Sequence, residues 1–225
     1  MTNVEAVFLD VGGVFSLPTV ADVGRYLAER GAEGTPETVE RCHYHGMAAY
    51  DVAEGGEPER SAAYATGFLA GAGLGAEHAP GLVAAIRVRG WQPVIRTSLE
   101  ALPRLAATGV RLAVVSNSDG TVEERLAAAG VAQVGPGPGV VLLAAIDSHV
   151  VGIEKPDPRI FELALRACDV RPEAVVHVGD SRRTDVAGAQ AAGIRPLHLD
   201  PFDLCPDRTH EHVRTLGEVV TLVSG

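Results

Sequence analysis

Three polar residues, Asp10, Ser116 and Asp180, each follow a short apolar run. The runs are Ala6–Leu9, Leu112–Val115 and Ala174–Val178. Aliphatic and β-branched runs of this length are typical of parallel strands that are buried on both faces. Because ligands of open α/β sheets bind beyond the carboxyl ends of the strands, these side chains are candidates for one shared site. Carboxylates there suit a nucleophile or a metal ligand, although each residue alone also fits a turn or a helix cap.

A lysine, Lys155, lies between the second and third of these residues, and with it the chain resembles the haloacid dehalogenase superfamily. Val7–Phe15 resembles the first motif of the family, a strand that ends in the nucleophilic aspartate. The segments that resemble the second, third and fourth motifs are Val114–Gly120, Gly152–Phe161 and His177–Ala189. The third and fourth are specific, and the four motifs in order cover nearly the whole chain.

The resemblance implies a hydrolase, most often a phosphatase that acts on a small phosphorylated metabolite. In the implied mechanism, Asp10 attacks phosphorus and forms an aspartyl-phosphate, which splits the hydrolysis into two steps. Lys155 holds the carboxylate and the phosphoryl oxygens together, and Ser116 donates a hydrogen bond. The groups expected to bind phosphate are Gly12, Gly13, Ser116, Asn117 and Lys155.

The resemblance also implies a Mg²⁺ cofactor, which prefers oxygen ligands and neutralises charge between a carboxylate and a phosphate. The carboxylates of Asp10 and Asp180 and the backbone carbonyl of Gly12 are the implied protein ligands. Asp185, five positions after Asp180, is expected to orient the metal ligands.

The chain departs from the family pattern at Gly12. Phosphatases of the family usually carry a second aspartate there, which protonates the leaving group and then activates water. General acid–base catalysis contributes about 10²–10⁴ in rate, so three outcomes stay open. Another group replaces the aspartate, the substrate has a good leaving group, or the protein is a catalytically weak phosphate-binding or regulatory protein. A dehalogenase-like Asp-ester hydrolase is a further alternative, although Asp180 and Asp185 retain metal-binding character that such an enzyme does not need.

The fold class predicted for the core is α/β, a doubly wound parallel sheet of Rossmann-like type, because apolar strands alternate with helix-period stretches. Two further strands are predicted at Val140–Ile146 and Pro196–Leu199. Helices are expected at Leu99–Ala107, Thr121–Ala129, Arg159–Cys168 and Asp185–Ala192. Gly109, Gly130 and Gly193 are expected as helix C-terminal caps.

Residues 17–95 break this alternation and predict an all-helical cap domain, inserted into a core domain of residues 1–16 and 96–225. Helical patterns occur at Val20–Arg30, Pro36–Ala53, Pro58–Ala70 and His78–Arg87. The insertion corresponds in position to the family's cap, which closes over the site and selects the substrate.

His43, Met47 and Tyr50 are spaced so that they share one face of the second predicted cap helix. We list them as candidate substrate contacts, and His43 as a candidate replacement for the missing acid, because the imidazole pKa lies near neutrality. A purely structural helix face is the simpler interpretation of the same spacing. Arg87, Arg89 and Trp91 are expected at a hinge or on the surface.

The net charge of −10 argues against nucleic acid and anionic membranes as partners. The first residues lack a basic region, and no apolar run is long enough for a membrane span, so a cytoplasmic protein is expected, as a monomer or homodimer. Three dispersed cysteines suit a reducing compartment. His198, Cys205 and His210 have metal-binding side chains, but their spacing in the sequence matches no familiar metal site.

Overall fold

A parallel six-stranded sheet forms the centre of the core and confirms the predicted fold class. The computed structural model describes residues 4–224, except the side chains of residues 88 and 89. The strand order is β10-β9-β8-β1-β4-β7, and every neighbouring pair is parallel. The strands are β1 (Ala6–Leu9), β4 (Arg111–Ser116), β7 (Ala144–Asp147), β8 (Val175–Gly179), β9 (Arg195–Leu199) and β10 (Glu211–Val213).

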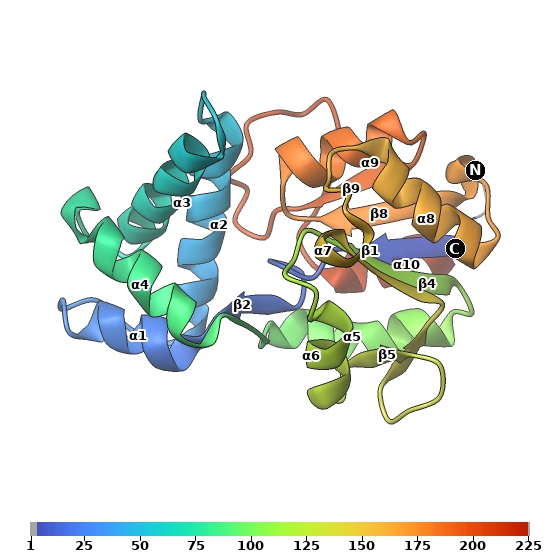
Figure 1. Ribbon diagram of the computed structural model, residues 1–225, viewed down its shortest axis with the longest axis horizontal. Coiled ribbons are helices and arrows are strands. Elements are labelled where there is room, and N and C mark those ends of the chain that lie inside the picture. Colours follow the sequence, from blue (N-terminus) through green and yellow to red (C-terminus); the bar gives the residue numbers. More distant parts are fainter. Residues whose placement is uncertain (1–3, 225) are drawn as a thin grey trace.

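Helices cover both faces of this sheet, which explains why its strands are continuous apolar runs (Figure 1). Val7 and Leu9 of β1 pack in one cluster with Leu105 of α5 (Arg96–Ala107) and with α10 (Leu216–Ser224). Phe8 packs on the opposite face with Phe161 of α8 (Pro158–Cys168) and with α9 (Ala187–Ala191). The shorter elements of the core are α6 (Val122–Ala128), α7 (Ser148–Val151) and η2 (Pro172–Ala174).

Four helices form a separate body beside the core, which we call the helical unit (Figure 1). They are α1 (Val20–Ala28), α2 (Pro36–Val52), α3 (Glu57–Gly71) and α4 (Ala79–Arg89), with the short η1 (Ala76–His78) before α4. They coincide closely with the helices predicted from the sequence. Phe68 and Leu69 are fully buried in a hydrophobic cluster that belongs to this unit. The helical unit therefore has a core of its own.

Two short antiparallel strands connect the helical unit to the sheet. β2 (Ser16–Pro18) enters the unit and β3 (Trp91–Pro93) leaves it, with Ser16 paired to Pro93 and Pro18 to Trp91. These strands were not predicted, because three residues are too few to show a periodicity.

Two predicted elements differ in the structure. The strand predicted at Val140–Ile146 is divided at Leu143: β6 (Val140–Leu142) pairs with β5 (Ala132–Val134), whereas β7 joins the main sheet. The helix predicted at Asp185–Ala192 begins earlier, as a wide π-helical turn, η3 (Arg182–Val186), that continues into α9. The turn is wide because the carbonyl of Ser181 accepts from the N–H groups of both Asp185 and Val186.

The predicted caps are confirmed, because Gly109, Gly130 and Gly193 follow their helices with φ of 84°, 66° and 73°. In residues 4–224, none of the helices combines the length and the apolar character needed to cross a bilayer.

Candidate active site

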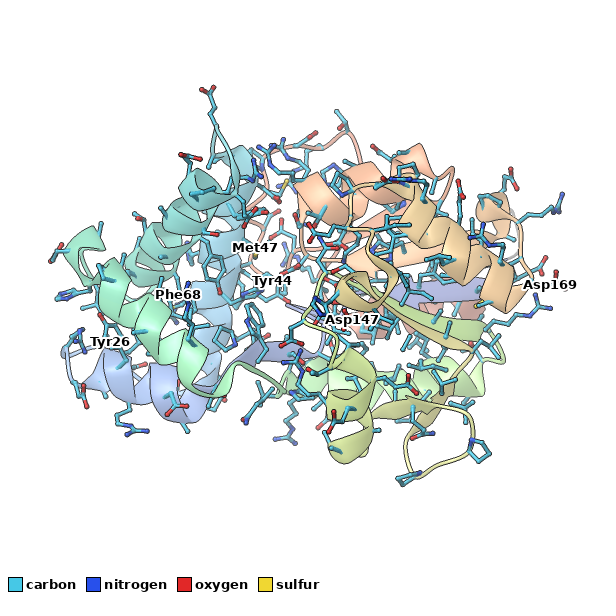
Figure 2. All side chains as sticks on the ribbon, viewed as in Figure 1. Tyr26, Tyr44, Met47, Phe68, Asp147 and Asp169 are labelled. Atoms are coloured by element: carbon cyan, nitrogen blue, oxygen red, sulfur yellow. The ribbon has the colours of Figure 1, made fainter. Side chains whose placement is uncertain are left out.

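The carboxyl ends of β1, β4 and β8 bring Asp10, Ser116 and Asp180 to one edge of the sheet. There they line a cleft of about 860 Å³ together with Lys155, which comes from the loop before α8. The helical unit supplies the opposite wall. Figure 2 shows Tyr44 and Met47 on the side of α2 that faces the core. The cleft therefore lies between the sheet edge and the helical unit.

Lys155 is buried in an ion pair with two carboxylates. Its Nζ lies 2.9 Å from Asp10 Oδ1 and 2.6 Å from Asp185 Oδ1. Burial disfavours the ammonium form, but Asp10 and Asp185 outweigh it and raise the pKa of Lys155. The side chain of Asn117 holds the Lys155 backbone from both sides, because Oδ1 accepts from its N–H at 2.8 Å and Nδ2 donates to its carbonyl at 3.0 Å. The residue after Ser116 thus fixes the position of the lysine.

Both oxygens of Asp185 are engaged by protein groups. Oδ1 contacts Lys155 and lies 2.9 Å from His177 Nε2, whereas Oδ2 accepts from the N–H of Ser181 at 3.1 Å. Burial alone would raise the pKa of Asp185, but Lys155 and His177 hold it well below its usual value. In this arrangement the carboxylate holds the Lys155 ammonium against Asp10.

His43 of α2 reaches across the cleft to Asp180. Its Nε2 lies 2.7 Å from Asp180 Oδ2, its Nδ1 lies 3.0 Å from the Tyr64 hydroxyl, and the side chains of His43 and Asp180 are both buried. Burial raises the pKa of Asp180 to about 6, against the opposing effect of His43. The Trp91 ring stands edge-on to His43, with centroids 5.4 Å apart. The contact between His43 and Asp180 joins the helical unit directly to the carboxylates.

The turn after Asp10 depends on a glycine at position 13. Gly13 has φ of +64°, and a Cβ there would lie 1.9 Å from Asp180 Oδ2, so any side chain would disrupt the site. Its N–H donates to the Ser16 carbonyl at 2.9 Å, and its carbonyl accepts from the Tyr44 hydroxyl. The N–H expected to bind phosphate is therefore engaged within the protein.

Gly12 is different, because a Cβ would fit there. Among the described residues, a Cβ at Gly12 would meet only Trp91, at an ordinary contact distance of 3.8 Å. The lack of an acid at this position is therefore not imposed by a shortage of space.

The carboxylates of Asp10, Asp180 and Asp185 have oxygens within 4.8 Å of one another. Among the described residues of this cluster, the Lys155 ammonium pairs with two of the three carboxylates, Asp10 and Asp185, whereas Asp180 contacts His43. Asp10 Oδ1 forms an ion pair with Lys155 but receives no aligned hydrogen bond from the residues described. Burial raises the pKa of Asp10, which Lys155 opposes. A buried carboxylate oxygen and an excess of negative charge are what a divalent cation such as Mg²⁺ would satisfy.

The family model of the haloacid dehalogenase-like hydrolases matches residues 4–193, which is most of the chain. The chain belongs to this family. A phosphoserine phosphatase from Thermus thermophilus is 33% identical to this haloacid dehalogenase-like hydrolase over 147 residues, 65% of this chain and 49% of that protein. The chain spans about half or less of the length of curated relatives that it matches.

Solved structures of the family share the fold of this haloacid dehalogenase-like hydrolase. A 2-haloacid dehalogenase from Pseudomonas syringae is 24% identical, with a TM-score of 0.57, and a HAD phosphatase from Thermococcus onnurineus is 20% identical, with a TM-score of 0.58. Each match covers 98% of both chains. Because a dehalogenase and a phosphatase resemble it equally, the fold does not choose between these activities.

The three candidate substrate contacts, His43, Met47 and Tyr50, all line the cleft. Met47 lines it without a polar contact, and the Tyr50 hydroxyl donates to Glu57 at 2.9 Å in an exposed position. Arg87 and Trp91, expected at a hinge or on the surface, also line the cleft. The side chain of Arg89 lies outside the described residues.

Two aspartates with clear roles in positioning the site were missed. Asp147, at the end of β7, accepts from the N–H groups of Gly120, Val122 and His149 and so supports the loop after Ser116. Its position after an apolar strand was the signal that could have found it.

Asp51, at the end of α2, accepts from the Ser181 hydroxyl at 2.8 Å and from the Arg182 N–H at 2.6 Å. It therefore joins the helical unit to the residue that follows Asp180. No local signal marks it, because an aspartate in a helix is most often exposed.

Proposed function

We propose that this hydrolase is a Mg²⁺-dependent phosphatase that acts on a small phosphorylated metabolite through an aspartyl-phosphate on Asp10. The observation that supports this most strongly is the convergence of Asp10, Asp180 and Asp185 with the Lys155 ammonium in one buried cluster. Three carboxylates and one ammonium carry a charge of −2, which a dication balances.

In the proposed reaction, Asp10 attacks the phosphorus atom in line and the leaving alkoxide departs on the opposite side. Lys155, held by Asp185, attracts the phosphoryl oxygens, and the Ser116 hydroxyl donates to one of them. Asp10, Asp180 and the Gly12 carbonyl would hold Mg²⁺, which neutralises charge between carboxylate and phosphate when bound. Water then hydrolyses the aspartyl-phosphate and regenerates Asp10. The engaged N–H of Gly13 leaves those of Gly12 and Asn117 as the backbone groups proposed to bind phosphate.

Residues 17–95 are proposed to be a cap domain on a core of residues 1–16 and 96–225. Met47 and Tyr50 line the cleft from this side, so the helical unit would select the substrate and exclude water. The contacts of Asp51 with Ser181 and Arg182 support this proposal, because they hold the helical unit against the core.

His43 is proposed to act as the proton donor in place of the aspartate that phosphatases of the family usually carry at the position of Gly12. Its Nε2 faces the carboxylate cluster, and Tyr64 at Nδ1 fixes the ring orientation. A proton donor matters most for a poor leaving group. We expect His43→Gln to slow hydrolysis of an alkyl phosphate far more than that of an aryl phosphate with an acidic leaving group. An equal loss on both substrates would assign His43 a structural role.

A panel of phosphorylated metabolites, assayed with and without Mg²⁺, tests the proposed activity. We expect metal-dependent release of phosphate by the wild-type protein and none by Asp10→Asn, with Asp157→Asn as the control outside the cleft. Retained Mg²⁺ and phosphate binding without turnover would indicate a binding protein. Metal-independent release of halide from a haloacid would indicate the dehalogenase alternative.

A further inference from the structure

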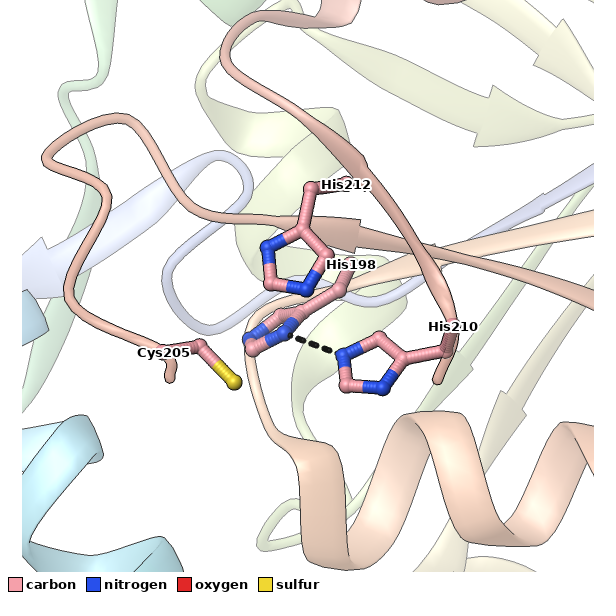
Figure 3. A group of neighbouring side chains, drawn as sticks. All are labelled: His198, Cys205, His210 and His212. Carbon is pink, nitrogen blue, oxygen red and sulfur yellow. Dashed lines mark hydrogen bonds between the residues drawn. The ribbon is translucent and has the colours of Figure 1, made fainter. Parts of the chain in front are cut away.

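Three histidines and one cysteine lie close together (Figure 3). The proposed phosphatase reaction does not use this cluster. One nitrogen from each of His198, His210 and His212 and the sulfur of Cys205 all lie within 4.8 Å of one another. His198 is buried, and the other three are partly buried. Nitrogen and sulfur donors separate this cluster chemically from the oxygen donors around Asp10.

The pairing of the last two strands creates half of the cluster. His198 on β9 and His212 on β10 are direct partners in the parallel register, so their side chains leave the same face of the sheet. Cys205 and His210 come from the connecting segment, residues 200–210, which has little regular secondary structure. The cluster therefore connects residues 200–210 to β9 and β10.

The ring nitrogens of His198 and His210 point towards each other, an arrangement that suits either a hydrogen bond or two ligands of one metal ion. His198 Nε2 lies 3.2 Å from the Asp180 carbonyl, which leaves His198 Nδ1 facing His210 Nε2 at 3.0 Å. Without a metal, one of these two nitrogens must carry a proton, whereas a metal ion accepts both lone pairs. The rings of His210 and His212 are stacked, with centroids 4.6 Å apart at 19°. Three imidazoles gathered this closely repel one another if they become protonated.

We propose that His198, Cys205, His210 and His212 bind one Zn²⁺ ion. Imidazole and thiolate are preferred ligands of Zn²⁺, whereas Mg²⁺ requires oxygen. Tetrahedral coordination at Zn–N of about 2.0–2.1 Å and Zn–S of about 2.3 Å separates ligand atoms by about 3.3–3.6 Å. The atoms lie within 4.8 Å of one another, so the most distant pairs would approach, whereas His198 Nδ1 and His210 Nε2, at 3.0 Å, would separate slightly. Binding converts the Cys205 thiol to a thiolate and releases its proton to water.

Neighbouring groups are placed to support such an ion. The Asp180 carbonyl can orient His198, and Asp200 Oδ2 lies 3.3 Å from His212 Nδ1, where it can orient the second ring. His212 Nε2 lies 2.9 Å from the Asp207 carbonyl, a contact that coordination of a metal ion would displace. Four protein ligands leave no open position, so the ion is structural and not catalytic. Its function is to fix residues 200–210 and the backbone of Asp180, which is one of the proposed Mg²⁺ ligands.

Zinc content of the untagged protein tests the site. After equilibration with Zn²⁺ and desalting, we expect one Zn²⁺ per chain by mass spectrometry of the metal. Cys205→Ser and His210→Ala should lose the ion, whereas the matched controls Cys168→Ser and His78→Ala should keep it. All measurements are repeated with Asp10→Asn and Asp180→Asn together, so that the carboxylate cluster does not contribute.

Cobalt provides a readout of the sulfur ligand. We expect Co²⁺ to produce a thiolate-to-metal charge-transfer band that Cys205→Ser abolishes and Cys168→Ser preserves. If the variants do not fold, protection of Cys205 from alkylation by Zn²⁺ in the wild-type protein supplies the same information. Zinc content that survives Cys205→Ser and His210→Ala, a wild-type protein that retains no zinc, or zinc lost only with the two aspartates would each overturn the proposal.

Discussion

His43 Nε2 lies 2.7 Å from Asp180 Oδ2, so a histidine of helix α2 contacts a carboxylate at the end of β8, 137 positions later in the chain. Both side chains are buried. The placement of the helical unit and the electrostatics of the carboxylate cluster are therefore coupled. Any ligand that attracts Asp180, a metal ion above all, competes with His43 for that oxygen.

Gly12→Asp is expected to increase phosphatase activity. A Cβ at position 12 meets only Trp91 among the described residues, at an ordinary contact distance, and an added general acid contributes about 10²–10⁴ in rate where protonation is limiting. The measurement is kcat on an alkyl phosphate in Mg²⁺. Gly12→Asn, of equal size but without a transferable proton, is the control, and an equal response of both variants would show that protonation does not limit the rate.

Lys155→Met is expected to abolish activity and to destabilise the fold. Lys155 is the sole lysine of the chain, and its loss leaves Asp10 and Asp185 buried without their shared cation. Removing one partner of a buried ion pair costs about 3–5 kcal/mol. Urea unfolding followed by circular dichroism measures this cost. Arg96→Met, which removes an exposed ion pair with Glu100, should change the unfolding free energy much less, because solvent screens exposed pairs. A similar effect of the two substitutions would contradict the assigned role of Lys155.

Asp51→Ala is expected to loosen the helical unit. The substitution leaves the Arg182 N–H and the Ser181 hydroxyl without their acceptor, at a cost of about 1–3 kcal/mol. Hydrogen exchange should rise at residues 181–183 and at the end of α2. Glu100→Gln, which alters an exposed helical carboxylate, serves as the control. Unchanged exchange at residues 181–183 would show that this contact does not hold the two bodies together.

The thiols are expected to react unequally in the metal-free protein. Burial raises the pKa of Cys42 and of Cys168 to about 11, and the thiolate is the reactive form. Their reaction with a disulfide reagent should therefore be slow at pH 8 and accelerate as pH rises towards 11, whereas the more accessible Cys205 reacts first. Peptide mapping after labelling identifies each site. Equal labelling of all three in the native protein would contradict the observed burial.

The sequence predicted the main sheet well because its strands are buried on both faces and therefore read as uninterrupted apolar runs. β2, β3, β5 and β10 have three residues each, and strands of that length exist only through their pairing partners. The same reasoning applies to η3, whose wide turn depends on hydrogen bonds from Ser181 and not on a local pattern.

The residues of the candidate site were predictable where they follow the ends of strands or belong to a specific motif. Asp10, Lys155 and Asp180 line one cleft, as the order of the motifs indicated, and their roles remain proposals. Tyr64 and Asp51 could not be found in this way, because each acts through a contact between the helical unit and the core. Such contacts depend on how two bodies dock, and helical periodicity carries no information about docking.

The pairing of Pro18 with Trp91 means that the chain leaves the sheet and returns to it at adjacent points. An insertion attached in this way puts no demand on the register of the six-stranded sheet, whatever its length. The helices between these two residues can be exchanged, enlarged or shortened during evolution, or grafted by protein engineers, while the strands that carry Asp10 and Asp180 keep their places.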